Sequence, residues 1–458
     1  MAANIKLINR LKREEVEKTQ MKKFQVLFNR IVASNLFYRN KFKKAGIKSS
    51  KGIRDWKDFY KLPFTTKKEL WEDQKKNGLF GTNITRSLEK DSERIFSSTG
   101  TIKKHSIFWF ETHDDAKRRA NFFCGHYKMT GIKRGDRFLL IGPPFDSYPR
   151  FASVYEALNM MGVTVVVVGS TMPMEAIKNL KTFPFKVLNC SPSYAFHLAE
   201  CLIENGHNPI KLGIKKIIAI GEPGGSNYLI KKRVEEIWGA KLYDLLAMGE
   251  TGSTYGIECQ FLSGSHLSED WYIFEIINPK TLRPADEGEL VITNLWREGF
   301  PLIRYRTGDF TKINRNQCRC GSAFYRLRDG IPGRLEFMTR IDGRQFFPSD
   351  FEGVIFPFFP EVREFRVEVD KHRNKDRVTV ILETKTDDKR RLVTIINEKI
   401  ETKLELNADF IVFHRCRFPR LLNKQLRLID RRKTAKKNLY VRTRESLSRI
   451  KNKILLHY

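Results

Sequence analysis

The segment Tyr305–Asp309 reads YRTGD and places a carboxylate directly after the apolar run Phe300–Ile303. An earlier apolar run, Leu290–Ile292, is separated from Phe300–Ile303 by a polar turn. This pattern predicts a strand, a turn and a second strand. An ionised Asp309 offers two oxygens that only accept hydrogen bonds, which suits a ligand carrying a pair of hydroxyl groups. The alternative is that these charges are simply exposed at the end of a hairpin. Residue type alone leaves both interpretations open.

A second group of chemically suitable residues lies in Ser97–His105, which reads SSTGTIKKH. Hydroxyl groups, backbone N–H groups and a lysine ammonium in one short stretch can surround phosphate oxygens. A polar loop between two strands has the same composition. Taken alone, the stretch is therefore a weak indication of a phosphate site.

Three cysteines and one histidine form a third group, namely Cys259, His266, Cys318 and Cys320. Ligands in the order Cys, His, Cys, Cys suit a closed tetrahedral zinc site. Such a site is structural, because no coordination position stays open for a substrate. The alternative is a set of thiols without metal, since Cys-x-Cys is closer than typical zinc spacing.

The elements that must position these groups indicate an α/β protein. Residues 11–46 are expected to be helical, and Thr65 or Thr66 can cap a helix that begins at Lys67. From residue 113 to residue 213, helical segments alternate with buried strands such as Val163–Val168, which predicts parallel strands. Residues 361–415 read as strands around a helix near 386–405, which predicts a small α+β domain.

Length and composition limit the class of protein. A chain of 458 residues exceeds one ordinary domain, and 41% hydrophobic residues allow a substantial core. No apolar run approaches the roughly 20 residues of a membrane span. The N-terminus has no apolar signal region, and seven cysteines do not form a disulfide framework. We therefore expect a cytoplasmic location.

The net charge of +31 suggests an anionic partner, although a Lys-rich composition of the source organism would give the same charge. The basic residues are spread along the chain, except in the last segment. Between Arg431 and Tyr458 there are ten Lys or Arg residues and one acidic residue. Residues 433–458 are thus a basic tail with an anionic partner as its expected ligand, and helical spacing of Ile454 and Leu455 with earlier apolar residues favours a helix.

Several strings together resemble the phenylacetate–CoA ligase family of the adenylate-forming enzymes. They are LPFTTKKEL (62–70), YRTGD (305–309) and the ending FPRLLNKQLRLIDRR (418–432). The resemblance covers about residues 20–432. It implies a large AMP-binding domain over 1–334 with mixed or parallel sheets and a small mobile α+β lid over 335–432. It leaves open a homodimer.

The resemblance also implies roles for single residues. Asp309 would hold the ribose of ATP, and Arg334 would reach the ribose or the phosphates. Glu250 would hold Mg²⁺, Lys424 would act on the reacting carboxylate and phosphate, Glu336 would be the hinge, and Gly343 would contact CoA. Further ATP-binding positions are Ser98, Thr99, Gly100, Thr101, Lys104, Gly221, Glu222 and Pro223.

This chain departs from the family pattern at defined points. In the phosphate loop, Ile102 and Lys103 stand where the family has Thr and Gly. Leu246 stands where an aromatic side chain would stack on adenine, and Gly249 replaces a hydroxyl residue before Glu250. A lost stack weakens binding by about 0.5–1.5 kcal/mol.

The activity implied is ATP-dependent activation of an aryl or arylacetic acid, through an acyl-adenylate, followed by thioester formation with CoA. Two alternatives remain open. The acyl group could pass to a carrier protein, a sugar or an amine instead. The departures and the charge also allow a basic protein that binds nucleic acid or an anionic surface on an inactivated ligase scaffold.

Overall fold

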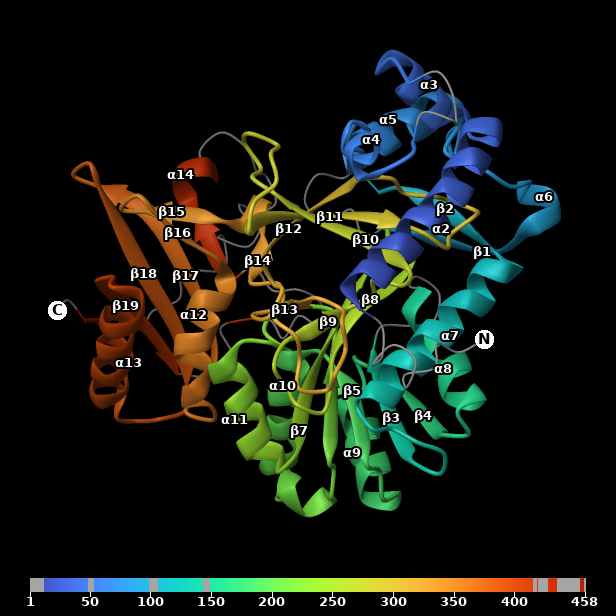
Figure 1. Ribbon diagram of the computed structural model, residues 1–458. Helices are drawn as coiled ribbons and strands as arrows, with labels where there is room; N and C mark the ends of the chain where they lie inside the picture. Colours follow the sequence, from blue (N-terminus) through green and yellow to red (C-terminus); the bar gives the residue numbers. More distant parts are fainter. Residues whose placement is uncertain are drawn as a thin grey trace.

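The computed structural model describes residues 12–47, 53–98, 106–142, 149–414, 418, 427–434 and 454–456 (Figure 1). A large α/β part lies beside a smaller α+β part formed by the orange and red C-terminal elements. This confirms the predicted fold class. None of the helices in these ranges is long and apolar enough to cross a membrane.

The large part is built on one mixed sheet with the strand order β10-β11-β12-β13-β9-β8-β7-β6-β5-β3-β4, and β14 pairs with β12. Neighbouring strands from β4 to β7 are parallel, whereas those from β7 to β10 are antiparallel. The parallel strands are β3 (Arg137–Gly142), β4 (Thr164–Gly169), β5 (Val187–Cys190), β6 (Lys216–Ala219) and β7 (Lys241–Met248). The others are β8 (Ser253–Glu258), β9 (Ser265–Leu267), β10 (Tyr272–Ile277), β11 (Glu287–Asn294), β12 (Tyr305–Asn314), β13 (Arg326–Leu327) and β14 (Gly333–Arg334).

Both faces of the parallel strands are covered, because successive side chains point to opposite faces. On β3, Phe138 and Leu140 pack in one core with α7 and α8, whereas Leu139 and Ile141 pack in another with α9, α10 and α11. This explains why the strands read as continuous apolar runs. The helices are α7 (His113–Met129), α8 (Pro149–Met160), α9 (Pro173–Thr182), α10 (Pro192–Glu204), α11 (Tyr228–Trp238) and the 3₁₀ helix η2 (Pro209–Leu212).

The N-terminal part of the chain packs on the antiparallel end of the sheet. The predicted helical segment 11–46 is two helices, because Asn35 leaves helical geometry and its side chain accepts a hydrogen bond from the Tyr38 amide. Thr66 is the cap of the helix beginning at Lys67, which confirms one of the two predicted caps. The elements are α2 (Arg13–Ser34), α3 (Leu36–Lys44), α4 (Trp56–Tyr60), α5 (Lys67–Asn77), α6 (Leu88–Asp91) and the hairpin β1 (Ser92–Ser97) and β2 (Phe108–Thr112).

The small part contains a five-stranded sheet in the order β20-β17-β18-β19-β21. Its last strand is β21 (Ile454–Leu456), so the helix expected for Ile454 and Leu455 was wrong, because these residues pair with β19 instead. The remaining elements are η3 (Leu335–Phe337), β15 (Thr339–Ile341), β16 (Arg344–Phe346), α12 (Pro348–Ile355), η4 (Phe356–Phe358), β17 (Val362–His372), β18 (Lys375–Thr384), α13 (Lys389–Leu404), β19 (Ala408–His414), β20 (Leu428–Asp430) and α14 (Arg431–Thr434).

The two parts meet through α10 and α11 of the large part and α12, η4 and β17 of the small part. The Phe196 and Phe356 rings stack with centroids 5.1 Å apart. Arg363 of β17 forms ion pairs with both Glu200 and Glu204 of α10. One continuous hydrophobic core therefore runs through both parts in this arrangement.

Candidate active site

Asp309 and Arg334 face each other on paired strands. Asp309 lies on β12 opposite Arg334 on β14, and Arg334 Nε is 3.4 Å from Asp309 Oδ1. Arg334 also donates to the Thr307 carbonyl at 2.9 Å and lies 3.3 Å from the Glu336 carboxylate. Gly308 has φ +76°, and a side chain there would begin 3.3 Å from the guanidinium. The glycine thus keeps room for Arg334 beside Asp309.

Glu250 lies on the turn that follows β7 and is paired with a lysine from the N-terminal region. Lys67 at the start of α5 donates to Glu250 Oε1 at 2.8 Å. Burial alone would raise the pKa of Glu250, but Lys67, together with Arg334, outweighs burial and lowers that pKa. Glu250 is therefore an ionised carboxylate at neutral pH.

Arg334 connects the two carboxylates electrostatically. Burial alone would lower the pKa of its guanidinium, but Asp309, Glu336 and Glu250 outweigh burial and raise it. The predicted residues Asp309, Glu250, Arg334 and Glu336 thus lie in one neighbourhood, at the junction of the large sheet and the small part. Sequence reasoning missed Lys67, although it lies in the LPFTTKKEL string; only its helix cap was interpreted.

The predicted phosphate loop is only partly within the described residues. Ser98 accepts a hydrogen bond from the Ile107 amide through its hydroxyl and donates its own amide to the Ile107 carbonyl, both at 2.9 Å. It closes the base of the loop, and its side chain is buried. Thr99, Gly100, Thr101 and Lys104 lie outside the described residues.

The predicted adenine segment makes structural contacts of its own. Gly221 has φ +102°, and the Glu222 carboxylate accepts a hydrogen bond from the Ser193 amide at 2.6 Å in the first turn of α10. Leu246 is 6% exposed and packs in the hydrophobic core beside β8 and β9. A leucine at the expected stacking position is thus part of the core packing.

The ending of the predicted lid is described only from Arg427 onward, so Lys424 lies outside the described residues. Arg427 is buried and donates to Glu364 at 2.8 Å and to Glu352 at 3.0 Å. The turn between β15 and β16 has positive φ at Asp342 and Gly343, as a two-residue hairpin requires. Around Gly343, the structure leaves open space for an approaching ligand.

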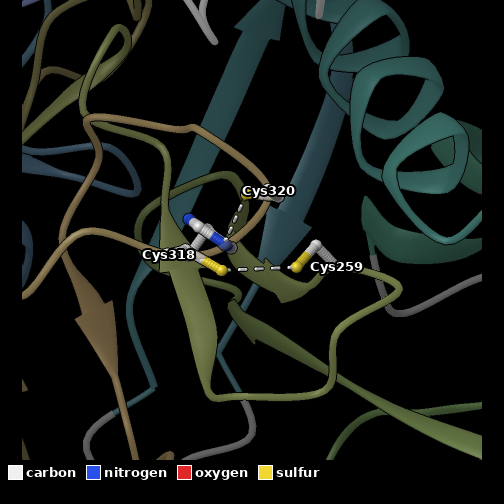
Figure 2. A group of neighbouring side chains, drawn as sticks. Cys259, Cys318 and Cys320 are labelled. Carbon is white, nitrogen blue, oxygen red and sulfur yellow. Dashed lines mark hydrogen bonds between the residues drawn. The ribbon is translucent and has the colours of Figure 1, made fainter.

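The four predicted zinc ligands come together from two regions of the sequence, 259–266 and 318–320, and Figure 2 shows the three cysteines. All ligand atoms lie within 4.8 Å of one another. Cys259 Sγ is 3.8 Å from Cys318 Sγ, and Cys320 Sγ is 3.4 Å from His266 Nε2. Zn–S and Zn–N bonds of about 2.3 and 2.0 Å in a tetrahedron place such atoms about 3.8 and 3.5 Å apart. The donor set therefore fits zinc in type, number and spacing.

A hydrogen bond between two thiols of the cluster shifts their pKa values in opposite directions. The pKa of Cys320 is lowered, because Cys259 and the His266 ring donate hydrogen bonds to its sulfur, whereas the pKa of Cys259 is raised. His266 Nδ1 is buried and has no hydrogen-bond partner among the described residues. The described cysteines are all free thiols.

The side chains around Asp309 can bind hydroxyl groups, phosphate or ribose oxygens and a divalent cation. Asp309 can accept from two hydroxyl groups, and Arg334 can donate to a phosphate or ribose oxygen. An ionised Glu250 fits Mg²⁺, which is usually held by one or two carboxylates together with waters and phosphates. Lys67 also places a positive charge beside the Glu250 carboxylate, in addition to the Mg²⁺ that this carboxylate could hold.

Comparison with known proteins agrees with this geometry. The family described as AMP-binding enzyme C-terminal domain matches residues 343–432. Phenylacetate-coenzyme A ligase of Thermus thermophilus is 28% identical over 378 residues, covering 81% of this chain and 82% of that protein. The Escherichia coli enzyme of the same name is 25% identical over 408 residues, covering 86% and 90%.

Solved structures give the same fold. A 2-hydroxyisobutyryl-CoA ligase in the postadenylation state superposes with a TM-score of 0.86 at 23% identity, covering 96% of this chain and 93% of the other. The same ligase in the thioesterification state gives 0.68, covering 95% and 92%. The arrangement of large and small parts here is thus closer to the postadenylation state. In its motifs, its relatives and its architecture, this chain is similar to the phenylacetate–CoA ligases over most of its length, and it has the fold of an adenylate-forming ligase.

Proposed function

We propose that this protein is an AMP-forming carboxylate–CoA ligase that activates an aryl or arylacetic acid with ATP. The observation that carries the proposal is the group formed by Asp309, Arg334 and Glu250 in a chain that matches phenylacetate-coenzyme A ligases over most of its length. A carboxylate for the ribose, a guanidinium and a second, ionised carboxylate are what ATP activation requires.

In this proposal the acid attacks the α-phosphorus of ATP, which forms an acyl-adenylate and releases pyrophosphate. The thiol of CoA then attacks the acyl carbon and AMP leaves. Asp309 holds the ribose and Arg334 orients the phosphate side. When bound, Mg²⁺ neutralises phosphate charge, and Glu250 would hold it. Lys424 supplies a cation where charge develops on the attacking carboxylate and the leaving oxygens.

The phosphate loop of Ser98, Thr99, Gly100, Thr101 and Lys104 would hold the released pyrophosphate in this scheme, and Gly221, Glu222 and Pro223 would border the adenine. After adenylation, rotation about Glu336 would bring Gly343 to the CoA arm. The Glu336–Arg334 ion pair of 3.3 Å supports this, because rotation at that residue would change the contacts of the ribose site.

The first test is carboxylate-dependent pyrophosphate release from ATP and Mg²⁺ over a panel of aryl, arylacetic and fatty acids. We expect release with one acid class and its loss in Lys424→Ala, with Lys433→Ala as a matched control from the basic tail. Release without dependence on any acid, or full activity in Lys424→Ala, would contradict the proposed mechanism. Adding CoA, an amine or a carrier protein to the formed adenylate then identifies the acceptor.

Zinc at Cys259, His266, Cys318 and Cys320 is part of the proposal as a structural ion. Its support is the fit of sulfur and nitrogen spacing to a tetrahedral site. The metal would join β8, β9 and the 318–320 segment, which has little other regular structure. Free thiols in all described cysteines support a reducing compartment, and hence the cytoplasm.

The basic tail after residue 432 adds an anionic partner to the proposal, supported by ten basic residues between Arg431 and Tyr458. Binding to anionic vesicles or nucleic acid that falls with salt, and that is lost when residues 435–458 are removed, would test this. Such binding without any ATP turnover would instead favour the binding-protein alternative.

A further inference from the structure

Two side chains of the segment 294–297 hold the backbone of the turn that carries Glu250. Arg297 Nη1 donates to the Glu250 carbonyl at 2.7 Å, and Asn294 Nδ2 donates to the Thr251 carbonyl at 2.8 Å. Within the turn, the Gly252 amide donates to the Gly249 carbonyl at 2.9 Å. Two neighbouring side chains of one segment therefore fix two successive peptide groups of the turn.

Arg297 is unusually placed for an arginine. It is 1% exposed, and the carboxylates of Asp115 and Glu111 act on its guanidinium electrostatically, but among the described residues neither lies within ion-pair distance of it. Its guanidinium lies 5.5 Å from the Trp109 ring and 5.4 Å from the Phe300 ring, and Nε has no hydrogen-bond partner. Burying a cation without a direct ion pair is unfavourable, so a merely structural role would be better filled by an apolar side chain.

Arg297 and Trp109 pack closely against the turn that carries Glu250. Gly252 has φ +85°, and a side chain there would begin 3.2 Å from the guanidinium carbon. Trp109 packs on the other side of the turn, 3.5 Å from where a side chain on Gly249 would begin. The turn thus packs against both Arg297 and Trp109, and a shift of Arg297 would be passed to Glu250 through their hydrogen bond.

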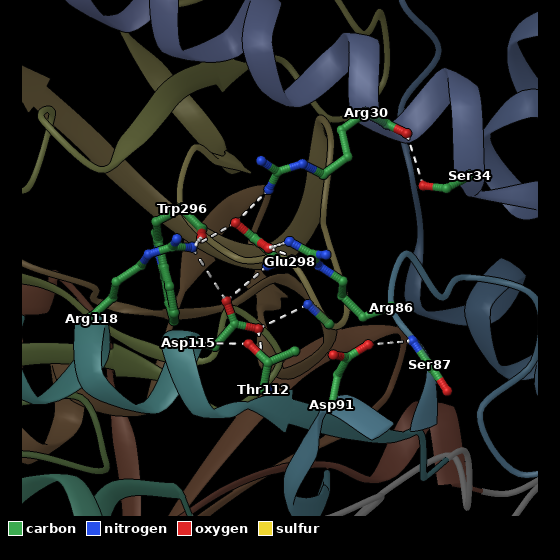
Figure 3. A network of polar contacts seen from close by, with 11 residues as sticks. Arg30, Ser34, Arg86, Ser87, Asp91, Thr112, Asp115, Arg118, Trp296 and Glu298 are labelled. Atoms are coloured by element: carbon green, nitrogen blue, oxygen red, sulfur yellow. Dashed lines mark hydrogen bonds and ion pairs between the residues drawn. The ribbon is translucent and has the colours of Figure 1, made fainter. Parts of the chain in front are cut away.

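The segment that bears Arg297 is itself anchored by a polar network, shown in Figure 3. The next residue, Glu298, pairs with Arg30 of α2, with Arg86 at 2.5 Å and with Arg118 of α7 at 3.0 Å. Asp115 accepts hydrogen bonds from the Glu298 and Gly299 amides at 2.9 and 2.8 Å. Three regions of the large part therefore fix the backbone on either side of Glu298.

We propose that Arg297 is a positioning residue for adenylation, which holds Glu250 in place through the backbone carbonyl of Glu250 and is in turn fixed by the Glu298 network. Arg297 does not touch the substrate in this proposal. This proposal rests on the proposed function, since Glu250 is the carboxylate expected to hold Mg²⁺. Together, Lys67 on the side chain and Arg297 on the backbone determine where that carboxylate lies.

The test compares Arg297→Met and Arg297→Lys with the wild type by two measurements that do not need turnover. The first is hydrogen exchange of the Gly252 amide, which reports whether the turn is held. The second is Mn²⁺ affinity in the presence of a non-hydrolysable ATP analogue, measured by electron paramagnetic resonance. Arg304→Met is the matched control, because Arg304 is also buried, at 6% exposure, but contacts Glu275, Tyr60 and Leu62.

We expect Arg297→Met to exchange the Gly252 amide faster and to weaken Mn²⁺ binding by about 10–100-fold, as loss of an outer-shell contact does. Arg297→Lys should restore part of the slow exchange of the Gly252 amide and part of the Mn²⁺ affinity, because an ammonium can still donate to the Glu250 carbonyl. Arg304→Met should lower the unfolding temperature without changing Mn²⁺ affinity.

Two results would overturn the inference. One is a folded Arg297→Met protein with unchanged exchange of the turn, whatever its activity. The other is faster exchange with unchanged Mn²⁺ affinity, which would make the contact structural only. If the wild type binds Mn²⁺ and nucleotide and Arg297→Met weakens that binding, but no acid supports pyrophosphate release, the inference stands and the proposed activity fails.

Discussion

Glu298 provides the most quantitative prediction, because one carboxylate holds three arginines from separate regions. Burial alone would raise the pKa of Glu298, but hydrogen bonds from Arg86, Arg118 and Arg30 outweigh burial and lower the pKa to about 2. The carboxylate side chain is 6% exposed, whereas the three arginine side chains are 34–43% exposed. We predict that Glu298→Gln destabilises the protein and that the loss depends on pH.

The magnitude follows from proton linkage. A shift from the unperturbed value of 4.5 to about 2 corresponds to about 3.4 kcal/mol at pH 7, at about 1.36 kcal/mol per unit. Because the arginines are partly solvated, we expect about 2 kcal/mol. A lowered carboxylate pKa stabilises the fold above the unfolded-state pKa, and this stabilisation is lost as pH falls toward the folded-state pKa. At pH 3 less than half of the pH 7 contribution should remain.

The assay is urea unfolding followed by tryptophan fluorescence at pH 7, 5, 4 and 3, comparing wild type with Glu298→Gln. Glu72→Gln is the control, since Glu72 is an exposed partner of Lys68 at 3.5 Å and should change stability by less than about 0.5 kcal/mol. The difference between wild type and Glu298→Gln should be largest at pH 7 and shrink with acidification. A difference below about 0.5 kcal/mol at pH 7, or one independent of pH, would refute the electrostatic reasoning.

Three further predictions address the site, the metal and the small part. Lys67→Met should raise the pKa of Glu250 and move the acid limb of the pH–rate profile for pyrophosphate release to higher pH, whereas Lys67→Arg should restore it; an unchanged limb would contradict the ion pair as the cause. Purified protein should contain about one zinc per chain by mass spectrometry, Cys318→Ser should lose it and melt earlier, and Cys190→Ser should retain it; a wild type without zinc would refute the site. Gly353→Ala should displace the small part, because the new side chain would begin 2.7 Å from Asn227 Nδ2, and should increase hydrogen exchange at the start of α11. Adding Asn227→Ser, which is shorter but still caps α11, should reverse this increase, and no rescue would show that this contact does not set the arrangement.

Local signals in the sequence were sufficient for several helix and strand segments and for the parallel part of the large sheet. The Thr66 cap, the apolar strand Thr164–Gly169 and the Asp342–Gly343 turn are each determined by residues within a few positions of one another. The order of strands in the large sheet could not be predicted, since β13 lies between β12 and β9, which are far apart in sequence. The break at Asn35 was missed because the helical pattern continues on both sides.

Site residues were predicted where they lie within a recognisable sequence motif. Those that join the site through contacts between residues distant in sequence were missed. Asp309, Arg334 and Glu250 lie in recognisable strings, and the four zinc ligands belong to residue types that are rare in this sequence. Lys67 and Glu250 are separated by 183 residues, and Arg297 and Glu250 by 47. No local pattern carries such pairings, because they depend on how the sheet and the N-terminal helices pack. The predicted roles of Asp309, Arg334 and Glu250 remain predictions, as do those of the residues outside the described ranges, namely Thr99, Gly100, Thr101, Lys104 and Lys424.

The charges within the described site explain why further cations are required. Lys67 and Arg334 contribute +2, whereas Asp309, Glu250 and Glu336 contribute −3, so these five residues sum to −1. A site of that charge would repel a nucleotide triphosphate. In the proposed reaction, Mg²⁺ at Glu250 and the predicted Lys104 and Lys424 would offset phosphate charge where it increases. Arg297 is left out of this sum, because its guanidinium donates to the Glu250 carbonyl and is buried beside the Trp109 and Phe300 rings, as a positioning role requires.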